Sequence, residues 1–137
     1  MKYFVRAILA TIIAALLSSC SYNSLVAADE NIIAQWAKVE NQYQRRADLV
    51  PNLVNTVKGY AAHESETLEA VIAARSKATQ ITVDPANLTE ENLQKYQEAQ
   101  GELSSALGKL LAITENYPDL KANQNFLELQ AQLEGTE

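Results

Sequence analysis

The chain is short of the residues that cross-link or bend small proteins. Its 137 residues include a single Cys, three Pro, four Gly, one Trp and two Phe. One Cys excludes an internal disulfide and any metal site built from several cysteines. So few turn-forming residues, together with a hydrophobic content of 47%, predict an all-α protein that is packed by Leu, Val, Ile and Ala.

Basic residues and histidine are also scarce. The chain has 11 Lys and Arg against 17 Asp and Glu, and one His. An acidic surface repels phosphate backbones and offers no basic apolar face, so nucleic acid is disfavoured as a partner and a membrane surface is a weaker alternative. His63 has carboxylates nearby only at different helical angles, and no nucleophile in a plausible relay. We therefore predict no catalytic site, no metal site and no cofactor.

The first 20 residues have the pattern of an export signal. Lys2 and Arg6 precede an apolar run of 11 residues, 7–17, which is too short to cross a bilayer alone. The run ends in Leu-Ser-Ser-Cys, which resembles the bacterial lipobox. Residues 1–19 are therefore predicted to be a signal peptide that is cleaved before a lipidated Cys20. A Ser after this cysteine resembles the pattern of outer-membrane lipoproteins.

An uncleaved anchor is the alternative. The uncharged stretch continues over residues 7–28, which is 22 residues and long enough to span a bilayer. The charges of Lys2 and Arg6 would then hold the N-terminus on the inner side of the inner membrane. Either anchor tethers a body of residues 21–137, in which nine basic and 17 acidic side chains give a net charge of −8.

A very long amphipathic helix is predicted over residues 31–62. Apolar or aromatic side chains alternate there three and four residues apart, which is the spacing of a single stripe along a helix. The stripe comprises Ile32, Trp36, Val39, Tyr43, Val50, Leu53, Val57 and Tyr60. We expect a stripe of this length to be covered by a partner along its whole length, as in a coiled coil.

Four residues in this helix are candidate interaction or structural residues. Arg46 places a charge on the stripe, which indicates an internal ion pair or a partner contact; the alternative is a guanidinium that reaches solvent past its aliphatic stem. Arg45 and Asp48 are expected to pair on the exposed face. Pro51 lacks an N–H and crowds the carbonyl of Ala47, so it is expected to kink the helix. The alternative is a new helix that starts at Pro51 and is capped by Asp48.

Three shorter helices complete a predicted antiparallel bundle of about four helices. The second covers residues 65–80. The third is capped by Asn87 or Thr89 and ends before Pro118, and the last starts at 120–123. Their apolar faces are predicted to comprise Leu68, Val71, Ile72 and Ala78, then Leu93, Tyr96, Gln100, Leu103, Leu107, Leu110 and Thr114, then Phe126, Leu129 and Leu133. Gly101 and Gly108, seven residues apart on the third helix, are expected to allow close helix packing.

Three segments of the chain resemble the LemA family of bacterial envelope proteins. Residues 22–26 read YNSLV, residues 44–60 read QRRADLVPNLVNTVKGY and precede His63 and Glu64, and residues 115–130 read ENYPDLKANQNFLELQ. The resemblance implies a helical bundle with a very long first helix, an N-terminal membrane anchor, a body outside the cytoplasm and no assigned activity.

Two features depart from the family pattern. Most members have a transmembrane anchor where this chain has the Leu-Ser-Ser-Cys sequence. Members also continue past residues 135–137 with another helical stretch, so the resemblance leaves open that this chain is a truncated product or a fragment.

The expected function is that of a membrane-anchored helical scaffold or interaction protein of the bacterial envelope. Its body is expected in the periplasm, at the outer rather than the inner membrane. Its expected partners are the membrane, unidentified envelope proteins and a second copy through the long helix. The alternatives are a periplasmic enzyme accessory and a module that binds membrane surfaces. Catalysis would require carboxyls of Asp48, Glu64 and Glu115 to converge in a desolvated cleft.

Overall fold

The computed structural model describes residues 1–17 and 21–137, and it is all-α as predicted. The described residues form α1 (Lys2–Lys58), α2 (Ser65–Gln80), a 3₁₀ turn η1 (Pro85–Asn87), α3 (Glu90–Thr114), the short α4 (Pro118–Lys121) and α5 (Gln124–Glu134). The chain divides into two compact units, Met1–Ala37 and Lys38–Glu137. We call the second unit the body.

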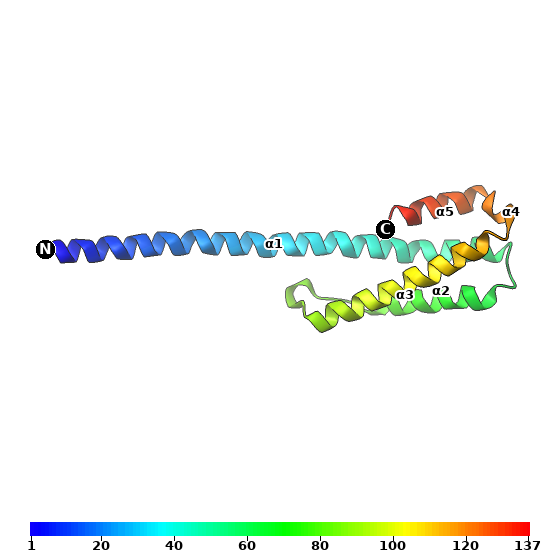
Figure 1. Cartoon of the computed structure of the whole chain (residues 1–137), viewed down its shortest axis with the longest axis horizontal. Helices are drawn as coiled ribbons and strands as arrows, with labels where there is room; N and C mark the ends of the chain where they lie inside the picture. Colours follow the sequence, from blue (N-terminus) through cyan, green and yellow to red (C-terminus); the bar gives the residue numbers. More distant parts are fainter. The chain divides into compact units, whose positions relative to one another are not determined.

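The body is an antiparallel bundle. The end of α1 is followed by α2, which runs back along it, and by α3, which returns beside α2; α5 then reverses direction once more (Figure 1). One continuous core joins the helices, because α2, α3, α5 and the end of α1 repeat apolar residues at three- and four-residue spacing, and α4 adds Leu120. Its largest fully buried side chains are Phe126, Leu53, Leu103, Leu110, Leu120, Val50, Val57 and Val71.

Helix ends follow the local sequence signals. α2 begins at Ser65 and ends at Gln80, as predicted. Thr89 caps α3 by accepting a hydrogen bond from the amide of Asn92 at 3.2 Å, and Asn123 caps α5 in the same way. Side-chain oxygens at these positions satisfy amides that have no partner inside the helix. The long helix was predicted to reach residue 62, but it ends at Lys58 because Gly59 begins a turn.

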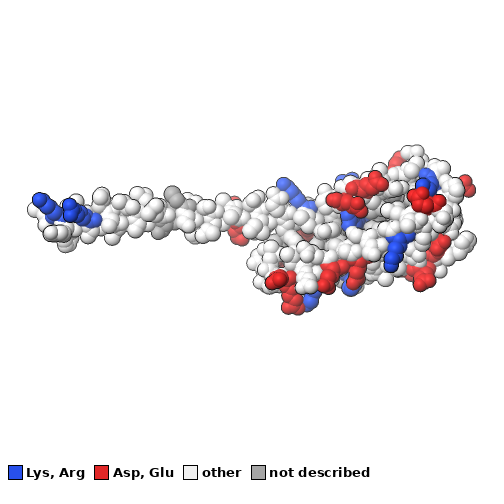
Figure 2. Space-filling model, in the orientation of Figure 1, with Lys and Arg blue, Asp and Glu red and all other residues white. Residues whose placement is uncertain are grey.

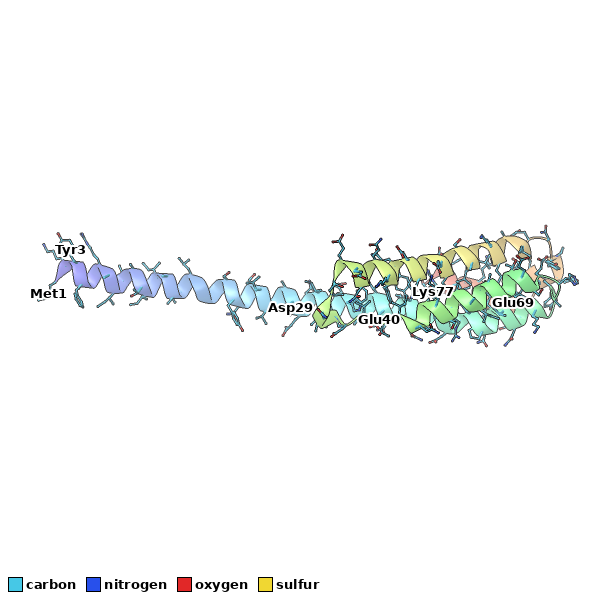
Figure 3. The ribbon with its side chains drawn as sticks, turned by 90° about the horizontal axis from the view of Figure 1, so that it is seen from below. Met1, Tyr3, Asp29, Glu40, Glu69 and Lys77 are labelled. Atoms are coloured by element: carbon cyan, nitrogen blue, oxygen red, sulfur yellow. The ribbon has the colours of Figure 1, made fainter. Side chains whose placement is uncertain are left out.

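The apolar faces of the shorter helices are largely as predicted. The predicted residues of α3 from Tyr96 to Thr114 are buried, and so are those of α5. Ile72 of α2 is an exception, since 51% of it is exposed. Lys77 of α2, which is labelled in Figure 3, forms an ion pair of 2.7 Å with Glu102 of α3 on the surface. Such an exposed pair contributes little stability.

Full coverage of the long stripe was predicted, and this prediction is wrong. Val50, Leu53 and Val57 are completely buried, whereas Val39 is 42% and Ile32 is 51% exposed. At about 1.5 Å per residue, the 16 residues of α2 cover roughly 24 Å of the helix beside them. Counted back from Lys58, that length ends near residue 43, so Val39 lies beyond it.

The glycines of α3 do not mediate close helix packing, contrary to the sequence-based expectation. A Cβ atom added at Gly101 or Gly108 would have no neighbouring atom within 4 Å. Both residues are exposed. A seven-residue spacing indicates that two residues share a helix face, but it does not say whether another helix covers that face.

The first unit has apolar side chains that are exposed to solvent. Within α1, an 18-residue window of mean hydropathy 1.9 has none of its residues buried. By length and composition this helix could cross a membrane, although a signal sequence has the same properties. The basic residues of the first unit lie at the start of the chain (Figure 2), and Tyr3 there stands out from the ribbon (Figure 3). Cys20, the predicted lipidation site, lies outside the described residues.

Candidate functional site

Arg46 is the most unusual side chain of the body, because it is a buried cation. Only 6% of it is exposed. Its Nε donates to Oγ1 of Thr136 at 3.2 Å, one terminal nitrogen donates to the Thr136 carbonyl at 3.0 Å, and the other donates to Oγ of Ser104 at 2.6 Å. One guanidinium thereby joins α1, α3 and the turn that follows α5.

Two sequence-based interpretations of Arg46 are wrong, namely the internal ion pair and the guanidinium that reaches solvent, whereas the contact with a partner stays a prediction. The guanidinium does not reach solvent, and within residues 1–17 and 21–137 no carboxylate lies at ion-pair distance from it. Neutral oxygens take the place of the expected counterion. Ser104 and Thr136 were missed because they lie 58 and 90 residues away along the chain, and hydroxyl residues on distant helices give no local signal.

An aromatic pair lies next to the guanidinium. The Arg46 guanidinium carbon is 5.7 Å from the centre of the Tyr43 ring, and Tyr43 packs edge to face on Tyr96 at 5.6 Å between centroids. Burial, with smaller contributions from the charge of Glu40 and from Tyr43, raises the pKa of Tyr96 to about 12. The Tyr96 hydroxyl therefore stays neutral at physiological pH.

Arg45 and Asp48 do not form the predicted pair. Both are exposed, and Asp48 accepts a hydrogen bond of 2.9 Å from the side-chain amide of Gln44 instead. Residues four apart stack on one face of a helix, and here Gln44 occupies that position relative to Asp48.

Pro51 lies within α1, so the alternative of a new helix starting at this residue is wrong. The kink stays a prediction. Because Pro51 has no N–H, the carbonyl of Ala47 loses its partner inside the helix. Nε of Arg75, from α2, donates to that carbonyl at 2.7 Å. The sequence could not reveal Arg75, since nothing near residue 75 indicates that it lies beside the proline.

The two longest segments that resemble the LemA family meet at the end of the bundle where α1 ends. The Tyr117 hydroxyl donates to Glu64 at 3.0 Å, and this hydrogen bond raises the pKa of Tyr117. Side-chain amides complete the contact: Asn123 donates to the Tyr60 hydroxyl and Asn125 to the Thr56 hydroxyl. These polar residues therefore hold α5 and the segment before it to α1 and its turn.

The three carboxyls that a catalytic site would require each have a different partner. Asp48 is bound to Gln44, Glu64 accepts from Tyr117, and Glu115 pairs with Lys121. Asp48 and Glu115 are also exposed, so they lack the desolvation that would prepare a carboxyl for catalysis. In the part of the chain that the structure describes, no group of three or more His, Cys, Asp or Glu residues could hold a metal ion.

Two hollows border Arg46. The larger, of about 390 Å³, is lined by Val39, Gln42, Tyr43, Arg46, Gly135, Thr136 and Glu137. The smaller is lined by Arg46, Ser104, Leu107, Gly108, Leu111, Leu133 and Glu137. Arg46 thus lines both hollows, and no other cation among the described residues lines either of them, which makes Arg46 the best candidate for a binding residue.

The comparisons with known proteins agree with this architecture. The sequence model of the LemA family matches residues 35–137. Protein LemA of Metamycoplasma hominis is 26% identical over 111 residues, which cover 81% of this chain and 47% of that protein. The chain thus spans about half the length of this curated relative. Because the family match includes the whole of the helical body, the chain belongs to the LemA family.

Proposed function

We propose that this protein is a membrane-anchored helical interaction protein of the bacterial envelope, with its body in the periplasm and no catalytic activity of its own. Membership of the LemA family and the apolar N-terminal helix support this proposal. The body contributes a bundle rather than a reactive cleft, because the side chains of Arg46, Arg75 and Tyr117 join its segments through hydrogen bonds.

The observation that carries the proposal is the exposure of apolar side chains in the first unit. Ile8, Leu9, Ile12, Ile13, Leu16 and Leu17 are each at least half exposed. Burying apolar area in lipid is favourable by roughly 25 cal/mol per Å². Residues 7–28 have a helical length of about 33 Å, which matches the hydrocarbon core of a bilayer.

Two anchors fit this segment, and we propose the lipid anchor. In it, cleavage before Cys20 removes residues 1–19 and leaves an acylated cysteine that is followed by Ser21. Two or more acyl chains hold a protein stably to a membrane, whereas one chain does not. Ser21 favours delivery to the outer membrane. In the alternative, residues 7–28 remain as a transmembrane helix.

Labelling of cells with a clickable fatty acid tests the anchor. We expect label in the full chain and none in Cys20→Ala, with Ser18→Ala as the control that keeps the cysteine. Mass spectrometry should give an N-terminus at residue 20. An unlabelled chain with Met1 intact in the membrane fraction would establish the transmembrane anchor, and a chain found only in the soluble fraction would overturn the proposal of an anchored protein.

The interaction role needs a separate experiment. Photo-crosslinking groups placed at exposed positions of the body, such as Gln42 and Ile72, should capture envelope proteins or a second copy in intact cells. Groups at buried Val50 should capture none. Equal capture from exposed and buried positions would indicate unfolded protein rather than a specific interaction.

A further inference from the structure

Arg46 has an uncompensated positive charge inside the body. It is almost fully buried, and its three hydrogen-bond acceptors, Ser104 Oγ, Thr136 Oγ1 and the Thr136 carbonyl, are neutral. An arginine in a protein cannot relieve its burial by losing its proton. Buried charges are normally paired, because desolvation of an unpaired ion is costly. A missing counterion is therefore the unusual feature of this site.

The guanidinium also has hydrogen-bonding capacity left. It carries five N–H donors, of which the three bonds in the structure use one on each nitrogen. One N–H on each terminal nitrogen is left over. Two N–H groups on neighbouring nitrogens match the two oxygens of a carboxylate, and such charge-assisted pairs are stronger than neutral hydrogen bonds.

Arg46 also lines a hollow at the surface of the body. The larger hollow beside Arg46 has a volume of about 390 Å³ and opens between α1 and the C-terminal turn. Its walls are mixed: Val39 and Tyr43 are apolar or aromatic, and Gln42 and Thr136 are polar. Glu137 also lines the hollow, yet among the described residues it forms no ion pair with Arg46.

The surroundings favour a single carboxylate over a phosphate. Residues 21–137 have a net charge of −8, and acidic and basic side chains are both spread over the face of the body that Figure 2 shows. A phosphate group or an anionic lipid surface brings more negative charge to this surface than one carboxylate does. The apolar wall of Val39 and Tyr43 suits the aliphatic part of an acidic side chain.

We propose that Arg46 binds the carboxylate of an acidic side chain on a partner peptide segment, which enters the hollow between α1 and the C-terminal turn. This inference rests on the proposed interaction role and names the chemistry that the body recognises. The bound carboxylate supplies the counterion that the fold lacks, so binding stabilises the body as well as selecting the partner.

Titration of the full chain in non-ionic detergent tests the site directly. The probe is N-acetyl-glutamate amide, its uncharged control is N-acetyl-glutamine amide, and the readout is the nuclear magnetic resonance signal of the Arg46 side-chain N–H. We expect a saturable shift with the glutamate probe and none with the glutamine control. Equal shifts with both probes, or tighter binding of inorganic phosphate than of the glutamate probe, would overturn the carboxylate assignment.

Gln42→Glu tests the missing counterion without removing Arg46. Gln42 lines the hollow four residues before Arg46, and Glu is best placed for an ion pair when it lies four residues before its cationic partner. The new carboxylate should compete with the probe and weaken its binding about tenfold, because it occupies the same donors. Gln97→Glu, at an exposed position of α3, adds the same charge elsewhere and should leave binding unchanged.

Removal of the cation completes the test. Arg46→Met should abolish the saturable binding, which is followed here through the backbone amide signals of Tyr43 and Thr136 because this variant has no guanidinium N–H. Arg45→Met, at an exposed neighbour, should preserve the binding. If Arg46→Met does not fold, as judged by circular dichroism, the pair of Gln42→Glu and Gln97→Glu decides alone. Equal probe affinity in that pair overturns the inference. Partners that are still crosslinked in cells would then show that the interaction role uses another surface.

Discussion

At the scale of single residues, the body relies on polar side chains that satisfy one another across helices. Arg46, Arg75 and Tyr117 each donate to an oxygen on a segment far away in the sequence. Each such hydrogen bond contributes only modestly to the free energy of folding. Loss of one partner is costly, however, because the buried group that remains has given up its water without a replacement. These side chains therefore fix which helices meet.

Tyr96 should make the body less stable at alkaline pH. Its pKa of about 12 in the folded chain exceeds the ordinary value of 10.0. A raised folded pKa contributes stability that is complete below pH 10 and is lost as the pH rises toward 12, by about 2 kcal/mol. Urea unfolding at pH 8 to 11.5 should show this decline.

Tyr96→Phe is the matched variant for this measurement. It should reduce the decline above pH 10, whatever its effect on stability at pH 8, and Tyr117, whose pKa is also raised, contributes to the decline that remains. Tyr22→Phe, at a position that is 69% exposed, should keep the decline of the parent chain. Identical pH dependence in the parent chain and in Tyr96→Phe would contradict the role assigned to this hydroxyl.

At this scale the sequence predicts positions better than partners. Arg46 is recognisable as a charge on an apolar stripe, because the stripe is a local pattern. Its acceptors belong to α3 and to the C-terminal turn, and which distant hydroxyls approach a given helix position depends on the packing of the whole bundle. The same limit applies to Asp48, whose actual partner Gln44 was one of several residues within reach.

At the scale of elements, a proline and an arginine connect α1 to α2. Pro51 leaves the Ala47 carbonyl without its helical partner, and Arg75 supplies the missing donor from the next helix. Ala47 is 2% exposed, so water cannot replace that donor. The bond fixes how far α2 lies along α1, because only one position of α2 places Arg75 next to this carbonyl.

A double-mutant cycle of Pro51→Ala and Arg75→Met measures this connection. Arg75→Met alone should lower the free energy of unfolding by about 1 to 2 kcal/mol, since it leaves the carbonyl unpaired. Pro51→Ala restores an amide that can pair with the carbonyl, so it should be neutral or stabilising, and Arg75→Met should cost less than half as much in that background. Additive effects of the two changes would contradict the connection.

Gly101 offers a simpler test of element stability. A Cβ atom there would have no neighbour within 4 Å, so Gly101→Ala adds no clash and removes the flexibility of glycine in a helix. We expect the free energy of unfolding to rise by about 0.5 to 1 kcal/mol, measured by urea unfolding. A loss of stability would instead support the close helix packing that the seven-residue spacing suggested.

Helices were predictable where local chemistry determines them. Thr89 and Pro118 mark helix starts through their own side chains, and the observed bounds of α3 and α4 follow these signals. α2 begins at Ser65 as predicted, but without a side-chain cap. How much of the apolar stripe of α1 the neighbouring helices would cover was not predictable. A stripe of apolar residues from Ile32 to Val57 looks uniform in sequence, but the partner helix is short and leaves Val39 exposed. The four-residue α4 was missed because a single helical turn has no periodicity to detect.

At the scale of the whole molecule, folding and anchoring use different residues. Among the described residues, every hydrophobic side chain of the core lies between Ala47 and Leu133. The apolar side chains of residues 1–17 are instead exposed, and each of the large ones is at least half exposed. The energy that folds the body therefore does not come from the segment that we propose to anchor it.

Deletion of residues 1–28 should separate these two properties. The shortened chain should leave the membrane fraction, because it has lost both the apolar run and Cys20. Its far-UV circular dichroism should remain strongly α-helical, with an unfolding midpoint in urea close to that of the full chain in non-ionic detergent, since the core from Ala47 to Leu133 is intact. A substitution in that core, Leu53→Ala, is the control that should cost about 2 to 5 kcal/mol in either background. If the shortened chain were unfolded or aggregated while the full chain was stable, the apolar segment would have to support the fold directly, and the separation of anchor and body would be wrong.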